Sequence, residues 1–455
     1  MHPQKADRDL TGEVDLRGAL RVDLVASSCV EDDASDPPVL NPEDLAILRL
    51  ESEKIAGHTC KVITLDAPPG GGSISEGLRE HITGRLERFP RMTERLSDDY
   101  RRPAWVPDDR FDVRKHVLVW ERAAPASRAD LLDIVAELMT TRLDRSRPLW
   151  SIHLVDLDEG RVALVLLIHH CMADGTTAVR LCSEVLWDPL GAIDEPSHPS
   201  HAQAPAPTSA HLNLRGCIRR ELMPKAADTP FDRHPSARRR VATARANLAE
   251  LKRIGKEVGD GATVNDVVLC AVGGGLRSWL ERHGGPLREI RVKVPVSLHD
   301  QHERSGEFGN RDSFMLVDVG TDEPDSAARL RRITLQTREM KTQHDAQSLD
   351  RLFQKLRHVS SLASQALSSW SANPHVFTIN VSNVPGPRGP VAVMDGAVRE
   401  LFTLAEIANR HALRVAAISL GDELSFGLCA DAVAVEAPET IAVGIEAELA
   451  ALSLL

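Results

Sequence analysis

One stretch of fourteen residues limits how this chain can fold. Residues 162–168 read Val-Ala-Leu-Val-Leu-Leu-Ile, and His169-His170-Cys-Met-Ala-Asp174-Gly175 follows at once. An apolar run of this length and β-branched content predicts a strand buried on both faces. The strand would carry two histidines to the rim of a core, and the glycine lets the chain turn there. A fixed, partly desolvated imidazole with a pKa near neutrality is suited to act as a general base.

The paired histidines also have simpler interpretations. A histidine at the end of a strand is often a structural residue, and two adjacent histidines can be metal ligands. The other histidines do not form a metal-binding motif, because His302-Glu303 lacks the second histidine of a zinc-binding His-Glu-x-x-His helix. We therefore expect no metal.

Length and composition narrow the class of protein. A chain of 455 residues favours two domains of about 200 residues each. The net charge of −11 argues against nucleic acid as a partner. Seven cysteines, an odd number without a Cys-x-x-Cys pair, indicate free thiols in a reducing cytosol. The charged first residues do not read as a leader, and no apolar run approaches the ~20 residues of a bilayer span. The expected location is therefore the cytoplasm.

The pattern of elements predicts an α/β protein with two halves of similar size. A helix should begin after Asn41 and another after Thr263, since both residue types cap helices. Residues 348–370 have apolar residues at three- and four-residue steps, which predicts a long amphipathic helix. The expected organisation is an N-terminal extension over 1–39, a first domain over 40–188, a crossover linker over 189–235 rich in Pro, Ala and Ser, and a second domain over 236–455.

Several short motifs occur in a fixed order around the histidines. Pro148-Leu149-Trp150 precedes them, and Asn265-Asp266, Val294-Pro-Val-Ser-Leu298 with Gly309-Asn310, Val381-Ser382-Asn383-Val-Pro-Gly-Pro387, and Leu424-Ser-Phe-Gly427 with Asp431 follow. In this order the chain resembles the bacterial wax ester synthase/diacylglycerol acyltransferase family of the CoA-dependent acyltransferase superfamily. The resemblance implies two chloramphenicol-acetyltransferase-like domains, each a mixed β-sheet flanked by helices. It places His170 between them, in a channel open from both sides.

The resemblance also assigns roles to residues. His170 would be the general base, with Asn265 stabilising the oxyanion and Asp266 beside it at the active site. His169 would orient or pack, Asp174 would be structural before Gly175, and Pro148, Leu149 and Trp150 would support the fold. Ser382 and Asn383 would lie by the substrate, although their Pro-Gly setting also reads as a rigid turn. Arg239 and Arg240 belong to the densest basic stretch, which either meets CoA phosphates or forms a solvated helix face.

These assignments imply an acyl-CoA-dependent O-acyltransferase that uses acyl-CoA as a substrate and needs no cofactor. The acceptor would be a lipid alcohol, with diacylglycerol first and a long-chain fatty alcohol second. Two alternatives stay open: a polyketide-associated or condensation-type acyltransferase with a carrier-protein donor, and a non-catalytic lipid-binding protein of droplet surfaces. Peripheral contact with a membrane or lipid droplet is expected through the helix at 348–370. The sequence leaves the oligomeric state open.

Overall fold

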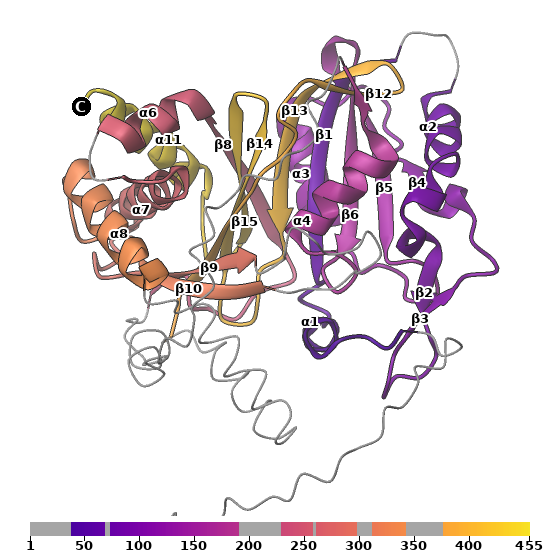
Figure 1. The fold of residues 1–455 in the computed structure, drawn as a ribbon, viewed down its shortest axis with the longest axis horizontal. Coiled ribbons are helices and arrows are strands. Elements are labelled where there is room, and N and C mark those ends of the chain that lie inside the picture. The colour runs from indigo at the N-terminus through magenta and orange to yellow at the C-terminus, as the bar shows by residue number, and fades with distance from the viewer. Residues whose placement is uncertain (1–37, 69–72, 191–228, 258–260, 298–311, 343–375) are drawn as a thin grey trace, which may run out of the picture. The chain divides into compact units, whose positions relative to one another are not determined.

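Two β-sheets carry the structure, a computed structural model that describes residues 38–68, 73–190, 229–257, 261–297, 312–342 and 376–455 (Figure 1). The first sheet has seven strands in the order β4-β5-β6-β1-β13-β12-β7. Their bounds, in that order, are Val117–Val119, Trp150–Leu157, Arg161–His169, His58–Asp66, Gly396–Ala405, Val391–Val393 and Asp188–Pro189. The predicted strand at 162–168 is β6, and the preceding strand β5 pairs with it antiparallel.

Both faces of β6 are buried, as the uninterrupted apolar run predicts. Leu164, Leu166 and Ile168 belong to one hydrophobic cluster, and the alternate residues Ala163, Val165 and Leu167 belong to another. The helices beside the first sheet are α1 (Pro42–Leu50), α2 (Ile74–Thr83), α3 (Arg128–Leu138) and α4 (Gly175–Leu181), which continues as the π-helical turn η5 (Cys182–Leu186). The short 3₁₀ turns are Leu86–Arg88, Pro90–Thr93, Val113–Lys115 and Asp158–Gly160, and a small sheet joins β2 (Glu94–Leu96) to β3 (Trp105–Pro107).

The second sheet has six strands in the order β10-β9-β11-β14-β15-β8. Their bounds are Asp312–Asp318, Arg291–Ser297, Ile379–Val384, Leu413–Leu420, Glu423–Asp431 and Arg239–Asn247. One face packs on a single apolar cluster shared with the helices α6 (Leu248–Glu257), α7 (Val264–His283), α8 (Ser326–Thr342) and α11 (Glu439–Ser453). The α/β class with two mixed sheets flanked by helices is therefore confirmed.

The helix ends follow the capping chemistry of the sequence. The side chain of Asn41 accepts a hydrogen bond from the amide of Asp44 at 2.7 Å, as predicted for the start of α1. Ser127 and Asp130 form a reciprocal cap at the start of α3, and Thr263 and Asp266 form one at the start of α7.

The strands of the first sheet do not all come from the first half of the chain. β13 lies between β1 and β12, and it pairs antiparallel with β1. Both β12 and β13 follow the expected domain boundary at residue 236, so that boundary does not separate the strands of the two sheets. β13 then leads directly into β14 of the second sheet, which ties the two sheets together through one continuous segment (Figure 1).

Several predicted segments lie outside the described residues. They are most of the linker at 189–235, the Gly309-Asn310 pair, His302-Glu303, the N-terminal extension and the amphipathic helix at 348–370.

In the described ranges, no helix combines the length and hydropathy needed to cross a bilayer.

Candidate active site

The two histidines of the motif are fixed by backbone hydrogen bonds to neighbouring segments. The amide of His169 donates to the carbonyl of Leu149 at 2.9 Å, and the amide of His170 donates to the carbonyl of Gly57 at 2.9 Å. The end of β6 is therefore held from both sides, which is what a side chain needs in order to be presented in one orientation.

The imidazole of His170 lies within electrostatic reach of the second sheet. Its nearest charged neighbours include Arg414, the second residue of β14, and Asp174. Burial is the main cause that lowers the pKa of His170, and the positive charge of Arg414 lowers it further, to about 4. Asp174 and a contact with the residue's own backbone act in the opposite direction without cancelling the shift. The ring is thus neutral at physiological pH and able to accept a proton.

His169 lies behind His170 in a polar network. Its side chain is buried, its Nδ1 accepts from the amide of Cys171 at 3.2 Å, and its Nε2 lies 3.4 Å from a carboxylate oxygen of Glu51. These contacts assign the proton to Nε2, which donates toward Glu51. Arg145 binds the same carboxylate at 2.9 Å. Burial alone would raise the pKa of Glu51, but the bonds from His169 and Arg145 lower it overall.

The space around His169 also fixes the backbone nearby. Gly57 has a φ of +75°, and a Cβ at this position would lie 2.7 Å from the Nε2 of His169. Only glycine suits both the conformation and the contact.

Asp174 and Gly175 connect the motif to α4. A carboxylate oxygen of Asp174 accepts from the amide of Thr177 at 2.6 Å and so caps the helix, and the residue is buried. A Cβ on Gly175 would lie 2.7 Å from a methyl of Val384 at the end of β11. The helix start therefore lies directly against the second sheet.

A second buried charge lies below the motif. Lys61 of β1 is 2% exposed, and its Nζ donates to Thr403 of β13 at 2.7 Å. Burial lowers its pKa, and the negative charge of Asp174 is among the causes that oppose that change. Lys61 thus contributes to the field around the carboxylate of Asp174.

The second sheet turns a polar row toward the motif. Asn380 and Ser382 alternate along β11 with the core residues Ile379 and Val381, and Arg414 pairs in register with Asn380. Alternation places these polar residues on the face opposite the second sheet's core. Ser382 and Asn383 are half-buried at the end of β11, next to Val384 and hence to the start of α4.

Asn265 and Asp266 occupy a different place. Asp266 is 1% exposed and accepts from the amide and hydroxyl of Thr263 and from the hydroxyl of Thr337, all within 2.8 Å. Its carboxylate is fully used as a helix cap. The side chain of Asn265 is half-buried and makes no hydrogen bond within the described part of the chain.

Asn265 and Trp279 lie near opposite ends of α7. Trp279 donates to the carbonyl of Glu436, just beyond the end of β15, and Asn265 lies about 21 Å away along the helix. The catalytic roles expected of Asn265 and Asp266 stay predictions.

Pro148, Leu149 and Trp150 pack and hydrogen-bond within the first-sheet part of the fold. The indole nitrogen of Trp150 donates to the carbonyl of Met92 at 2.8 Å, and its ring stacks on His116 with centroids 4.4 Å apart. Leu149 is buried and provides the carbonyl that holds His169, whereas the carbonyl of Pro148 accepts from the amide of Trp150.

The two arginines of the basic stretch, expected either to meet CoA phosphates or to form a solvated helix face, differ in their surroundings. The side chain of Arg239 is 1% exposed, and it bonds to Glu406 at 2.8 Å and approaches Asp431 at 3.7 Å. A guanidinium committed to two buried carboxylates has no donor left for a ligand. Arg240 is exposed and pairs with Glu439 at 3.1 Å. Both residues begin strand β8 and do not form a helix face.

Sequence reasoning missed Glu51, Lys61 and Arg414. Two of them carried a signal, since Lys61 lies among apolar and hydroxylic residues in the middle of β1 and Arg414 is the one charged residue of β14. Buried charges of this kind need partners and mark functional sites. Glu51 follows a helix and had no such signal.

Within the described ranges, no group of three or more His, Cys, Asp or Glu side chains is arranged to hold a metal ion.

Comparison with known families gives two matches in chain order. The wax ester synthase/diacylglycerol acyltransferase catalytic domain matches residues 40–223, and the C-terminal domain of the same family matches residues 308–453.

Curated relatives come from Mycobacterium tuberculosis. One protein named as a diacylglycerol O-acyltransferase in strain H37Rv is 30% identical over 445 residues, which cover 87% of this chain and 93% of that protein. Another from the same strain, with the same kind of name, is 28% identical over 447 residues, covering 89% of this chain and 93% of its own length.

Solved structures share the fold. The wax ester synthase/diacylglycerol acyltransferase from Marinobacter aquaeolei VT8 aligns with a TM-score of 0.68 at 22% identity, over 92% of this chain and 99% of that one. The starter condensation domain of rhizomide synthetase, solved in complex with C8-CoA and Leu-SNAC, aligns with a TM-score of 0.60 at 11% identity, over 92% and 94%.

Proposed function

We propose that this chain, which belongs to the wax ester synthase/diacylglycerol acyltransferase family and is an acyl-CoA-dependent O-acyltransferase, esterifies diacylglycerol first and long-chain fatty alcohols second. The observation that carries the proposal is the neutral imidazole of His170 at the end of β6, whose pKa is lowered to about 4 by burial and by the charge of Arg414 in the second sheet. Diacylglycerol comes first because the curated relatives carry that substrate in their names.

The proposed reaction is a direct transfer. His170 takes the proton of the acceptor hydroxyl while its oxygen forms a bond to the thioester carbonyl carbon. The carbon–sulfur bond then breaks, and the leaving CoA thiolate takes the proton from His170. Atoms and charge balance without an acyl-enzyme, a cofactor or a metal. The oxyanion role expected of Asn265 stays a prediction, and the transfer as written does not depend on it.

The network behind His170 has a positioning role in this proposal. Glu51 keeps His169 in one tautomer, and the backbone bonds of both histidines hold the end of β6. Arg414 keeps the base unprotonated before substrate arrives. A base that is neutral and fixed in advance costs no reorganisation when the hydroxyl binds.

The acceptors are poorly soluble in water, so we propose that the protein meets them at a membrane or lipid-droplet surface. The amphipathic pattern at residues 348–370 supports this proposal from the sequence alone, since it lies outside the described residues. Sedimentation with liposomes containing diacylglycerol tests it, and a protein that stays in the supernatant contradicts it.

Replacing the base tests the reaction. We expect His170→Ala to lower turnover by about 10²–10⁴-fold, the usual scale for loss of a general base, with the fold unchanged. The assay uses radiolabelled acyl-CoA, a panel of diacylglycerol and fatty alcohols, and separation of the lipid products.

The matched control is His153→Ala, because His153 also has a pKa lowered to about 4 by burial but lies on β5 within the first sheet. Its activity should stay near that of the wild type. Retention of more than about a tenth of the rate by folded His170→Ala would reject His170 as the base. Transfer only from an acylated carrier protein would instead indicate a condensation-type enzyme.

A further inference from the structure

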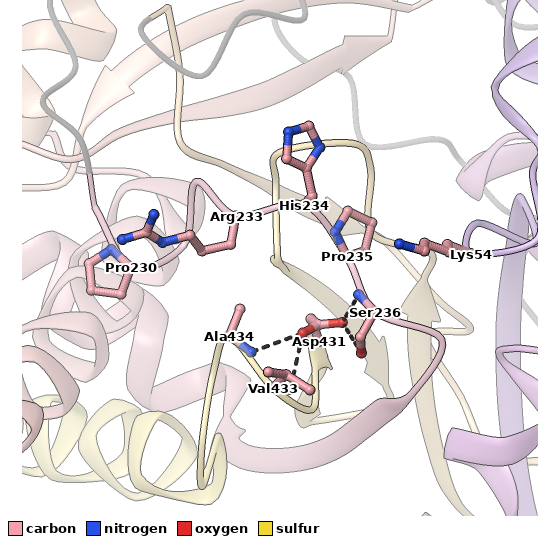
Figure 2. Close-up of a pocket in the computed structure, with 9 residues that line it drawn as sticks. All are labelled: Lys54, Pro230, Arg233, His234, Pro235, Ser236, Asp431, Val433 and Ala434. Carbon is pink, nitrogen blue, oxygen red and sulfur yellow. Dashed lines mark hydrogen bonds between the residues drawn. The ribbon is translucent and has the colours of Figure 1, made fainter.

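An open groove of about 540 Å³ lies beside the site, where segments from both halves of the chain meet (Figure 2). Its lining includes Lys54, just before β1, and Pro230 and residues 233–236, just before β8. Figure 2 shows Lys54 extending into the groove from the opposite side to Arg233, with Asp431 between them. The volume is within the usual range for a pocket that binds a small molecule.

The rim of the groove is positively charged. Lys54, Arg233 and His234 are all exposed, and neither Lys54 nor Arg233 forms an ion pair with any residue that the structure describes. The Nδ1 of His234 is engaged by the side-chain oxygen of Asn409 at 2.7 Å. In a chain with a net charge of −11, unpaired cations around a concave surface favour an anionic ligand.

The carboxylate at the floor does not oppose an anion. One oxygen of Asp431 accepts from the amide and hydroxyl of Ser236, and the other accepts from the amides of Val433 and Ala434 (Figure 2). The guanidinium of Arg239 lies 3.7 Å away. Four hydrogen bonds and a buried cation compensate the negative charge, so the exposed cations dominate the field in the groove.

The groove is also close to the proposed base. Lys54 precedes Gly57 by three residues, and three residues span at most about 11 Å. Gly57 in turn accepts the backbone hydrogen bond of His170 at 2.9 Å. A molecule that carries phosphates at one end and a reactive thioester at the other can therefore reach both places.

We propose that this groove binds the phosphates of the nucleotide end of acyl-CoA, with Lys54 and Arg233 as the ligands, while the thioester extends to His170. This inference rests on the proposed function. Both side chains are left to bind, because among the described residues neither forms an ion pair and only the backbone of Lys54 is used, its carbonyl accepting from Arg239. Charge-assisted bonds to phosphate are among the strongest that such side chains form.

The test is the double variant Lys54→Glu/Arg233→Glu in the full chain. We expect its KM for acyl-CoA to rise at least about tenfold, because two phosphate contacts become repulsive. The KM for the matching S-acyl-pantetheine, which has no phosphates, should change less than about twofold. The control is Lys115→Glu/Arg110→Glu, since both residues are exposed on the first-sheet side away from the groove. It should leave both values near those of the wild type.

Three results would overturn the inference. One is an unchanged KM for acyl-CoA in the double variant, and another is an equal rise for the pantetheine donor. The third is loss of binding to phosphatidylglycerol vesicles with unchanged use of acyl-CoA, which would assign the groove to a lipid phosphate. If the wild type transfers no acyl group at all, the proposed function fails. Calorimetric titration with 3′,5′-ADP then tests the phosphate site separately from the reaction. Binding that is lost in the double variant supports the site, and equal binding by wild type and variant rejects it.

Discussion

At the scale of the residue, the charge beside the proposed base controls its protonation. The guanidinium of Arg414 repels a proton on His170 and so lowers its pKa, in addition to the effect of burial. Only the neutral imidazole accepts a proton, so activity is lost as the pH falls through that pKa. The two statements together fix the direction of the acid limb of the pH–rate profile.

We therefore expect kcat/KM to stay level below pH 6.5 and to fall only near pH 4, the value to which the pKa of His170 is lowered. Arg414→Gln removes the repulsion and should move this acid limb to higher pH. Arg414→Lys keeps the positive charge, so its acid limb should lie near that of the wild type. The measurement is the pH–rate profile of folded protein, with Arg147→Gln as a control at an exposed ion pair. An acid limb that does not move in Arg414→Gln contradicts the proposed coupling.

At the scale of the element, the close approach of α4 to β11 leaves no room for a larger residue at Gly175. We expect Gly175→Ala to destabilise the protein by about 1–3 kcal/mol, because its Cβ would overlap Val384. Val384→Ala removes the overlapping methyl, so the double variant should lose less than the sum of the two single losses. Urea unfolding of the four proteins measures this coupling. Additive losses would show that the contact does not constrain the helix.

The cap of α7 makes a second prediction at this scale. Asp266→Ala leaves Thr263 and Thr337 without their shared acceptor, so we expect a loss of about 1–3 kcal/mol in the free energy of unfolding. The side chain of Asn265 makes no hydrogen bond in the described chain, so Asn265→Ala should change the free energy of unfolding by less than about 0.5 kcal/mol. Urea unfolding with activity per folded molecule separates the two roles. A stable Asp266→Ala variant with a hundredfold loss of rate would support the catalytic role expected of Asp266.

The elements also show which parts of the fold a sequence can predict. β6 and the start of α1 follow from local patterns, since one is an uninterrupted apolar run and the other has Asn41 before Pro42. β13 has no comparable local signal for its position, because pairing with β1 is decided by packing between residues more than 300 positions apart. The role of Arg239 could not be predicted from the sequence for the same reason. Its carboxylate partners Glu406 and Asp431 are far away in the chain and come close only in the tertiary structure.

At the scale of the whole molecule, buried histidines make the protein sensitive to acid. Burial lowers the pKa of His58, His153 and His170 from 6.5 to about 4. The unfolded chain therefore binds protons that the folded chain does not, and folding loses stability as the pH falls from 6.5 towards 4. The free energy of unfolding should decrease over this window before the carboxylates are protonated.

Urea unfolding at a series of pH values checks this expectation. His153→Gln removes one of the three titrating groups, so its stability should depend less steeply on pH. A free energy of unfolding that is constant between pH 6.5 and 5 would contradict the buried, neutral state of these rings.

The position of β13 has a consequence for how the protein is made. When β1 and β6 leave the ribosome, the free edge of β1 exposes unpaired backbone groups of a strand that is buried in the final fold. Its partner is translated about 240 residues later, which at ~5–20 residues per second is an interval of about 10–50 s. Until β13 has been synthesised, the first sheet has an unpaired edge that favours aggregation. We expect chaperones to protect this edge during that interval.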